Sequence, residues 1–105
     1  MKKEDVQSIS FQLISYAGDA FSYFFQAVSK AREGDFEEAD KLLAEGDKQM
    51  VQAHHAQTDL LTAEASGENV EFSVILVHAQ DHLTTTMMYE RVAKEFIALY
   101  KERSL

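Results

Sequence analysis

The chain has 105 residues, enough for one domain, and its 10 basic and 18 acidic side chains give a formal net charge of −8. This balance excludes the basic footprint of a nucleic-acid-binding protein, and the absence of cysteine excludes disulfides, thiolate metal sites and cysteine nucleophiles. A hydrophobic fraction of 46% is sufficient for a folded core. Because no signal-like or membrane-spanning apolar stretch is found, the sequence predicts a cytoplasmic protein that does not insert into a membrane.

The first predicted helix covers about residues 4–33, where apolar or small residues recur every three or four positions. Its buried face is expected to contain Val6, Ile9, Leu13, Tyr16, Ala20, Phe24, Ala27 and Ala31. A second apolar flank, which predicts two neighbouring helices, consists of Phe11, Ile14, Phe21, Phe25 and Val28. Gly18 lies inside this pattern at a cost of about 1 kcal/mol relative to alanine, so we expect another helix to approach it closely.

Two further helices follow after short breaks. Gly34 ends the first helix, and Asp35 is a predicted N-cap with Glu38 three residues later. The second helix covers residues 35–65 and ends at the turn-forming residues 66–69, and the third covers about 70–103. Long helices joined by short connections run antiparallel. The sequence therefore predicts a single all-α domain over residues 1–105, an up-down-up three-helix bundle.

The third predicted helix has two apolar faces. The first face suits packing within the protomer and consists of Leu76, Ala79, Leu83, Met87 and Ile97. The second face has heptad-like spacing and consists of Val74, His78, Asp81, Thr85, Met88, Val92 and Leu99. A three-helix protomer needs only one broad buried face on each helix. The second face therefore predicts contact with further copies of the chain in a closed cyclic oligomer.

Four polar side chains cluster at this second face. His78, Asp81, His82 and Thr85 bring two imidazoles, a carboxylate and a hydroxyl within about two helical turns. Burying such groups costs free energy unless they are paired, bound to metal or used in chemistry. A lone histidine on an apolar helix face is more often a packed core residue than a reactive one. The cluster, rather than either histidine alone, is what indicates a functional site.

Residues 77–83 (Val-His-Ala-Gln-Asp-His-Leu) resemble the active-site segment of enzyme IIA in the lactose/cellobiose branch of the bacterial sugar phosphotransferase system. Further matching blocks occur in order along the chain, at residues 15–20, 34–39, 53–58 and 64–68. Several ordered blocks are far more specific than any one of them. The resemblance implies a homotrimer of three-helix protomers, which agrees with the second face of the third helix.

The resemblance also implies residue roles. His78 would accept a phosphoryl group from the histidine-containing phosphocarrier protein and pass it to a cysteine of the IIB component during β-glucoside or disaccharide uptake. Asp81 would lie on the threefold axis and hold one Mg²⁺ per trimer. A neutral imidazole can act as the nucleophile near neutral pH. The sequence does not distinguish lactose, cellobiose, chitobiose and other β-glucosides, nor the two ring nitrogens of His78.

Four other polar residues lie near His78 in the sequence or on the second predicted helix. His82 lies one turn later and either hydrogen-bonds the nucleophile or phosphoryl group, or packs at an interface. Gln80 projects to the opposite side of the helix, and His54 lies on the second helix, so we expect neither to act at the site. His55, beside His54, is expected to be solvated.

Two positions depart from the family pattern, which more often has Arg or Lys at Phe21 and Met at Thr84. Phe21 would therefore lack any phosphate or partner contact that a basic residue makes there. Thr84 points away from the second face of its helix, so we expect little consequence from that change.

Two other functions share parts of the pattern. A histidine phosphotransfer module of two-component signalling is also a helical bundle with a phosphorylated histidine, but it typically has Lys and Gly soon after that histidine and a four-helix core. A purely structural, metal-pinned trimer would instead use His78 and His82 as additional ligands. Phosphorylation by the general phosphotransferase proteins distinguishes these alternatives.

Overall fold

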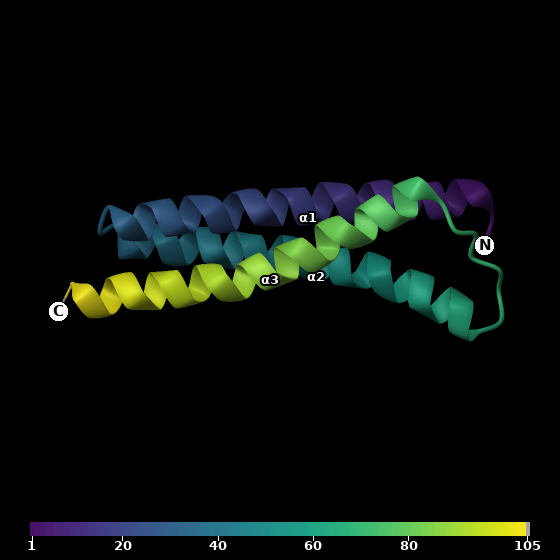
Figure 1. The fold of residues 1–105 in the computed structure, drawn as a ribbon. Helices are drawn as coiled ribbons and strands as arrows, with labels where there is room; N and C mark the ends of the chain where they lie inside the picture. The colour runs from purple at the N-terminus through teal and green to yellow at the C-terminus, as the bar shows by residue number, and fades with distance from the viewer. Residues whose placement is uncertain (105) are drawn as a thin grey trace.

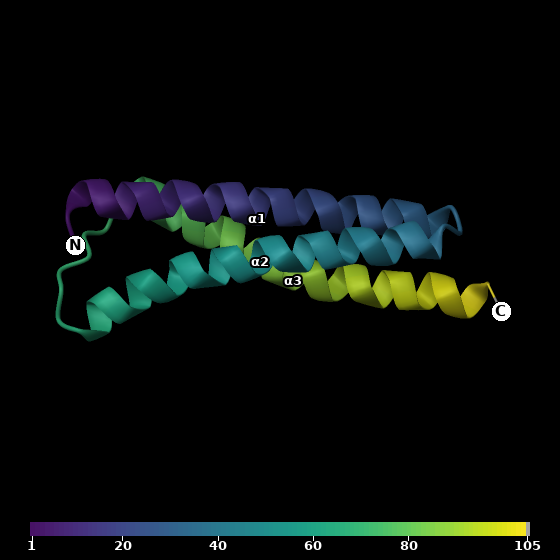
Figure 2. The same cartoon turned by 180° about the vertical axis from the view of Figure 1, so that it is seen from behind.

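The computed structural model describes residues 1–104, which form three α-helices of 30 residues each: α1 (Lys3–Arg32), α2 (Phe36–Ala65) and α3 (Val74–Arg103) (Figure 1). The molecule measures 54 × 19 × 18 Å, and its helices follow the long axis. α2 runs back along α1, and α3 returns in the direction of α1 (Figures 1 and 2). The predicted all-α, up-down-up arrangement is confirmed. None of the helices formed by residues 1–104 has an apolar stretch long enough to cross a bilayer.

The turn between α1 and α2 is short because a glycine ends α1. Gly34 has a φ of 86°, its N–H donates to the Ala31 carbonyl at 3.0 Å, and the next N–H, from Asp35, donates to the Lys30 carbonyl at 2.9 Å. These bonds satisfy carbonyls that the helix itself leaves free. Asp35 then caps α2, since its side chain accepts from the Glu38 N–H at 3.2 Å. The predicted helix break and N-cap are both confirmed.

The connection between α2 and α3 is longer than predicted. Helix α3 begins at Val74 rather than near residue 70, so residues 66–73 form the link. Ser73 has extended backbone angles (φ −152°, ψ 157°), and its hydroxyl accepts from the Leu76 N–H at 3.2 Å, which fixes the helix start. The end of α2 diverges from α1 while α3 begins beside α1, so the chain must span this gap (Figures 1 and 2).

Helix α1 is the element that positions both of the others. It packs against α2 and α3 along much of its length, whereas α2 and α3 contact each other little. Leu13, Ala20 and Phe24 of α1 are completely buried, as the periodicity of that helix predicts. Ala53 of α2 and Ala79 of α3 are also completely buried against this face, so small side chains let the helices approach α1.

Polar contacts connect α3 to α2. The Gln80 amide donates to the Gln57 amide oxygen at 2.6 Å, and Lys94 Nζ donates to Asp47 Oδ1 at 3.2 Å. Beside this ion pair, burial raises the pKa of the Glu90 carboxyl, a hydrogen bond from its protonated form to Asp47 adds to the increase, and the Lys94 charge opposes it. Exposed ion pairs contribute only about 0–1 kcal/mol each. Apolar packing on α1 therefore holds α3 in place.

Two details of the predicted core are wrong. Met87 is 41% exposed, and Thr86 takes the interior position, because its hydroxyl donates to the Ala17 carbonyl at 3.3 Å and is thereby satisfied. Among residues 1–104, no other helix packs closely against Gly18, where an added Cβ would have no heavy atom within 4 Å. The close approach expected at a helical glycine occurs instead at Gly46.

Replacing Gly46 with alanine should destabilise the protein. The added Cβ would collide with the completely buried ring of Phe24. Overpacking costs about 1–3 kcal/mol, whereas alanine gains about 1 kcal/mol in helix propensity, so we expect a net loss of about 1 kcal/mol. The melting temperature, measured by circular dichroism, should fall by about 4–8 °C. Gly18→Ala is the matched control and should raise it. Equal shifts at the two glycines would contradict this account.

Candidate functional site

A shallow depression of about 390 Å³ lies between α1 and α3. It is lined from α1 by Gly18 and Phe21 and from α3 by His78, Asp81, His82, Thr85 and Thr86. The cluster predicted from helical spacing is therefore brought together on one face of the molecule. The bond from Thr86 to the Ala17 carbonyl fixes α3 against α1 at this place.

His78 and His82 are in direct contact. Their Nε2 atoms lie 3.1 Å apart, and the rings are nearly perpendicular, at 89°, with centroids 4.5 Å apart. One nitrogen must donate and the other accept, so this hydrogen bond needs at least one neutral ring. When His82 is the donor, His78 carries its own proton on Nδ1 and has a lone pair on Nε2. This is the form in which an imidazole is a nucleophile, and His82 makes the contact that its predicted supporting role requires.

Asp81 is exposed on the same face of α3 and lines the same depression. Among residues 1–104, no three His, Cys, Asp or Glu side chains are placed so that they could hold a metal ion. A divalent cation such as Mg²⁺ prefers about six oxygen ligands, and one carboxylate leaves most of these to water or to other chains. The prediction of Asp81 as a metal ligand therefore depends on the assembly of several copies of the chain.

Three residues considered from the sequence lie outside the depression. Gln80 is bonded to Gln57 of α2, which agrees with a structural role. His54 and Thr84 line a different groove, between α2 and α3. None of the three therefore shares the depression with His78, as expected from their positions in the sequence.

Phe21 of α1 lines the depression. Its ring stacks on Tyr89 of α3 with centroids 4.6 Å apart and planes inclined by 28°, and its side chain remains 39% exposed. Burial raises the pKa of the Tyr89 phenol, an effect that the charge of Arg32 partly offsets. Within residues 1–104, no lysine or arginine lines the depression. A phosphoryl group bound here would therefore have no contact with a lysine or arginine among residues 1–104 of the same chain that lines the depression.

Gly18, Thr86 and the stacking of Phe21 on Tyr89 were not identified as parts of the site from the sequence. Thr86 continues the three-four spacing of Ala79 and Leu83, so its position is that of a buried residue. It was not assigned to the buried face because its side chain is polar. The stacking of Phe21 on Tyr89 depends on the alignment of α1 with α3. No local sequence signal specifies that alignment.

Comparison with known proteins gives consistent matches along nearly the whole chain. A family model described as "PTS system, Lactose/Cellobiose specific IIA subunit" matches residues 8–101. The lactose-specific EIIA component of Staphylococcus aureus (strain N315) is 43% identical over 101 residues, which cover 96% of this chain and 98% of that protein. The crystal structure of the cellobiose-specific enzyme IIA from Bacillus anthracis has a TM-score of 0.93 and 40% identity, covering 99% of this chain and 94% of that one. The IIA(Chitobiose) protein of Escherichia coli, solved as a complex with HPr, has a TM-score of 0.82 and 28% identity over 100% of both chains.

Proposed function

Because the chain belongs to the lactose/cellobiose-specific IIA family of the phosphotransferase system, and is thus a phosphocarrier, we propose that it carries the phosphoryl group on Nε2 of His78. The hydrogen bond between the Nε2 atoms of His78 and His82 is the observation that carries this proposal. With His82 as the donor, His78 carries its proton on Nδ1 and a lone pair on Nε2, which is the tautomer that the proposal requires. The same contact assigns His82 a supporting role.

The transfer step needs no net movement of a proton. Nε2 of neutral His78 attacks the phosphorus of a donor phosphohistidine, so the Nε2–P bond forms while the donor N–P bond breaks. The donor ring, protonated on its other nitrogen, leaves as a neutral imidazole, and His78 keeps its proton on Nδ1. Negative charge spreads over the three equatorial oxygens in the transition state. His82 lies close enough to donate to one of them, and the Thr85 hydroxyl lines the same depression.

The donor in this proposal is the histidine-containing phosphocarrier protein, HPr. The chitobiose relative, solved in complex with HPr, supports this choice. The acceptor is a cysteine of the IIB component, and the transported compound is a β-glucoside or disaccharide of the lactose, cellobiose or chitobiose kind. These three sugars are the ones that the related proteins name.

Incubation with phosphoenolpyruvate, enzyme I and HPr tests the proposal. Intact-protein mass spectrometry should show one acid-labile phosphoryl group per chain, and fragmentation should place it on His78. A histidine phosphotransfer module would instead take its phosphoryl group from a sensor kinase or a receiver domain. A chain that remains unmodified by the phosphoenolpyruvate-dependent proteins would contradict the proposed function.

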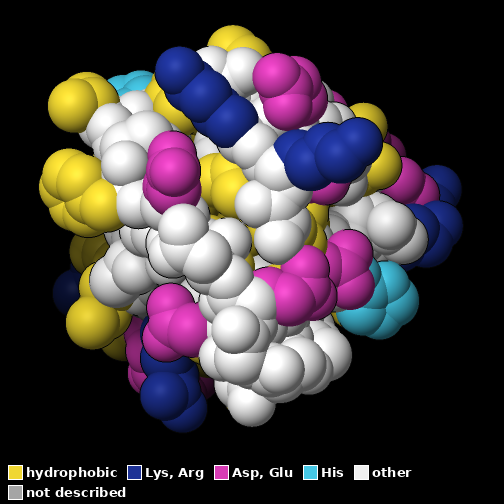
Figure 3. All heavy atoms as spheres, turned by 90° about the vertical axis from the view of Figure 1, so that its right-hand side faces the viewer, with side chains coloured by type: hydrophobic (Ala, Val, Ile, Leu, Met, Phe, Trp, Pro, Cys, Tyr) yellow, Lys and Arg dark blue, Asp and Glu magenta, His cyan; other side chains and the backbone are white. Residues whose placement is uncertain are grey.

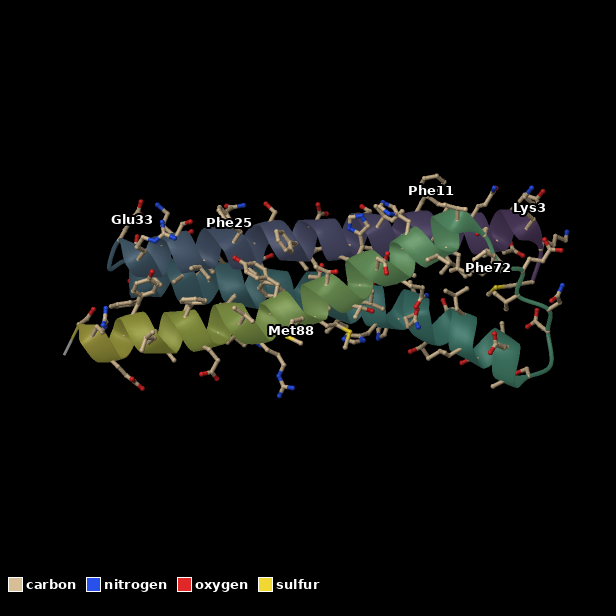
Figure 4. The ribbon with its side chains drawn as sticks, viewed as in Figure 1. Lys3, Phe11, Phe25, Glu33, Phe72 and Met88 are labelled. Atoms are coloured by element: carbon tan, nitrogen blue, oxygen red, sulfur yellow. The ribbon has the colours of Figure 1, made fainter. Side chains whose placement is uncertain are left out.

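We further propose that the protein is a homotrimer assembled through the second face of α3. Every residue of that face is exposed in the protomer, with Val74 at 82% and Met88 at 65%. Met88 points away from α1, while Phe11 and Phe25 extend from α1 away from the other helices (Figure 4). Viewed from the end that carries the N-terminus, hydrophobic side chains gather along one edge of the molecule (Figure 3). A continuous exposed apolar patch is typical of protein–protein contacts.

Light scattering at micromolar concentration should therefore give about three times the chain mass of 11.9 kDa. Met88→Glu should dissociate the trimer, since three carboxylates would enter an apolar contact. Met87→Glu is the matched control, because Met87 is exposed but lies off the second face of α3, and it should leave the mass unchanged. A monomeric wild type would contradict the proposed assembly.

A further inference from the structure

We infer that Gln57 of α2 is a positioning residue for the phosphoryl transfer. Through its hydrogen bond to Gln80, it fixes the rotation of α3 about its own axis and hence the direction in which His78 faces the donor. The inference rests on the proposed role of His78. Gln57 itself lies on another helix, outside the set of residues that line the depression.

A hydrogen bond between two amides joins the part of α3 that carries His78 to α2. The Gln80 amide donates to Gln57 Oε1 at 2.6 Å, and both side chains are half-buried. The other polar contacts between α2 and α3 among residues 1–104 begin at Glu90, ten residues farther along α3 and about 15 Å along its axis. Because α2 and α3 contact each other little, the amide pair is the main restraint that α2 places on this part of α3.

Apolar packing near His78 leaves the rotation of α3 weakly restrained. The buried side chains of this part of the helix, Ala79, Leu83 and Thr86, lie along a single stripe. A helix that is held along one stripe can rock about that stripe. The contact between His78 and His82 lies within α3, so it orients the ring relative to the helix but not the helix relative to the rest of the protein. A bond to another helix from a residue off the stripe is therefore needed to fix the rotation.

Rotation of α3 would displace His78 directly. His78 and Gln80 are two positions apart, so they project on nearly opposite sides of the helix, about 200° apart. Side chains reach about 5–6 Å from the helix axis, so a rotation of about 20° moves each of them by about 2 Å. A displacement of about 1 Å can slow a reaction about 100-fold, and in-line phosphoryl transfer depends on the direction of attack. The bond between Gln57 and Gln80 therefore acts on the chemical step through His78.

Steady-state transfer from phosphorylated HPr tests the inference. Gln57→Met keeps the length of the side chain but removes the acceptor, so kcat should fall about tenfold while KM for phosphorylated HPr stays unchanged. The melting temperature should change little, because water can replace the lost partner of a half-buried amide. Gln57→Glu keeps an oxygen that accepts from Gln80, so it should retain kcat to within about twofold of wild type. Gln52→Met is the matched control, the same substitution at an exposed position of α2, and should behave as wild type.

A double-mutant cycle shows whether the two amides act together. Gln80→Met should lower kcat as much as Gln57→Met does. The variant with both substitutions should be no slower than either single variant, because the same contact is lost in all three. Losses that multiply in the double variant would mean that Gln80 acts at the site independently of Gln57, which overturns the inference.

Three further results would also overturn the inference. A wild-type kcat in Gln57→Met would show that the bond does not orient His78. A lower melting temperature together with a loss of kcat that Gln57→Glu shares would assign Gln57 to stability alone. A smaller mass of Gln57→Met in light scattering would assign it to contacts between copies of the chain. In each case wild type still accepts phosphate on His78, whereas failure of wild type to do so would instead refute the proposed function.

Discussion

Replacing His78 with alanine should abolish phosphorylation by phosphoenolpyruvate, enzyme I and HPr. The substitution removes the nitrogen that forms the N–P bond, and among the described residues the only other imidazole that lines the depression is His82. Since His78 is exposed, its removal leaves no buried group without a partner, so helicity and melting temperature should remain close to wild type. Mass spectrometry of the intact chain after incubation should therefore show no added phosphoryl group.

The control for this experiment is His55→Ala. His55 is exposed on α2 and does not line the depression, so this variant should be phosphorylated at the wild-type rate. Undiminished phosphorylation of His78→Ala would refute the assignment. Partial phosphorylation, mapped to His82 by fragmentation, would show that the two histidines can exchange roles across their 3.1 Å contact.

The three helices and the residues that α3 contributes to the site could be predicted from the sequence, because both depend on the spacing of residues within one helix. The burial of Leu13, Ala20 and Phe24 matches the three-four periodicity of the first predicted helix. The contact between His78 and His82 follows from their separation of four residues in one helix and does not depend on the tertiary fold. The phosphocarrier function followed from the resemblance of residues 77–83 and of the blocks before them, and the family comparison confirms it.

The errors concern the boundary of one helix and the packing between helices far apart in sequence. Helix α3 starts at Val74 because Ser73 caps it there, but Val70 also fits an apolar pattern, so periodicity alone extended the helix. Gly18 and Gly46 both occupy helical positions, and only the packing of Phe24 shows which one is approached closely. A sequence pattern identifies the face of a helix that is buried, but not the atoms that it will meet.

Substitution of Asp81 by leucine should make the stability of the proposed trimer nearly independent of divalent cations. If three Asp81 carboxylates meet near a threefold axis at about 5 Å, each pair repels by roughly 3 kcal/mol at an effective dielectric constant of about 20, or roughly 10 kcal/mol for three pairs. This repulsion is comparable to the whole free energy of unfolding of a small domain, about 5–15 kcal/mol. The three carboxylates therefore either share a proton or bind a cation, and a hard ion with oxygen ligands such as Mg²⁺ suits them.

Melting curves of both proteins in EDTA and in excess Mg²⁺ measure this effect. Wild type should lose melting temperature on chelation, because a ligand that binds only the folded trimer stabilises it by mass action. Asp81→Leu should show no response to Mg²⁺ and should be more stable than wild type in EDTA, because an apolar side chain replaces an uncompensated charge. Activity does not decide the question, since the substitution also alters the depression around His78. Asp81 is not an axial ligand if the melting temperature of wild type does not change with Mg²⁺ and the leucine variant is less stable than wild type in both conditions. Its carboxylate would then stabilise the protein through a hydrogen bond that leucine cannot make.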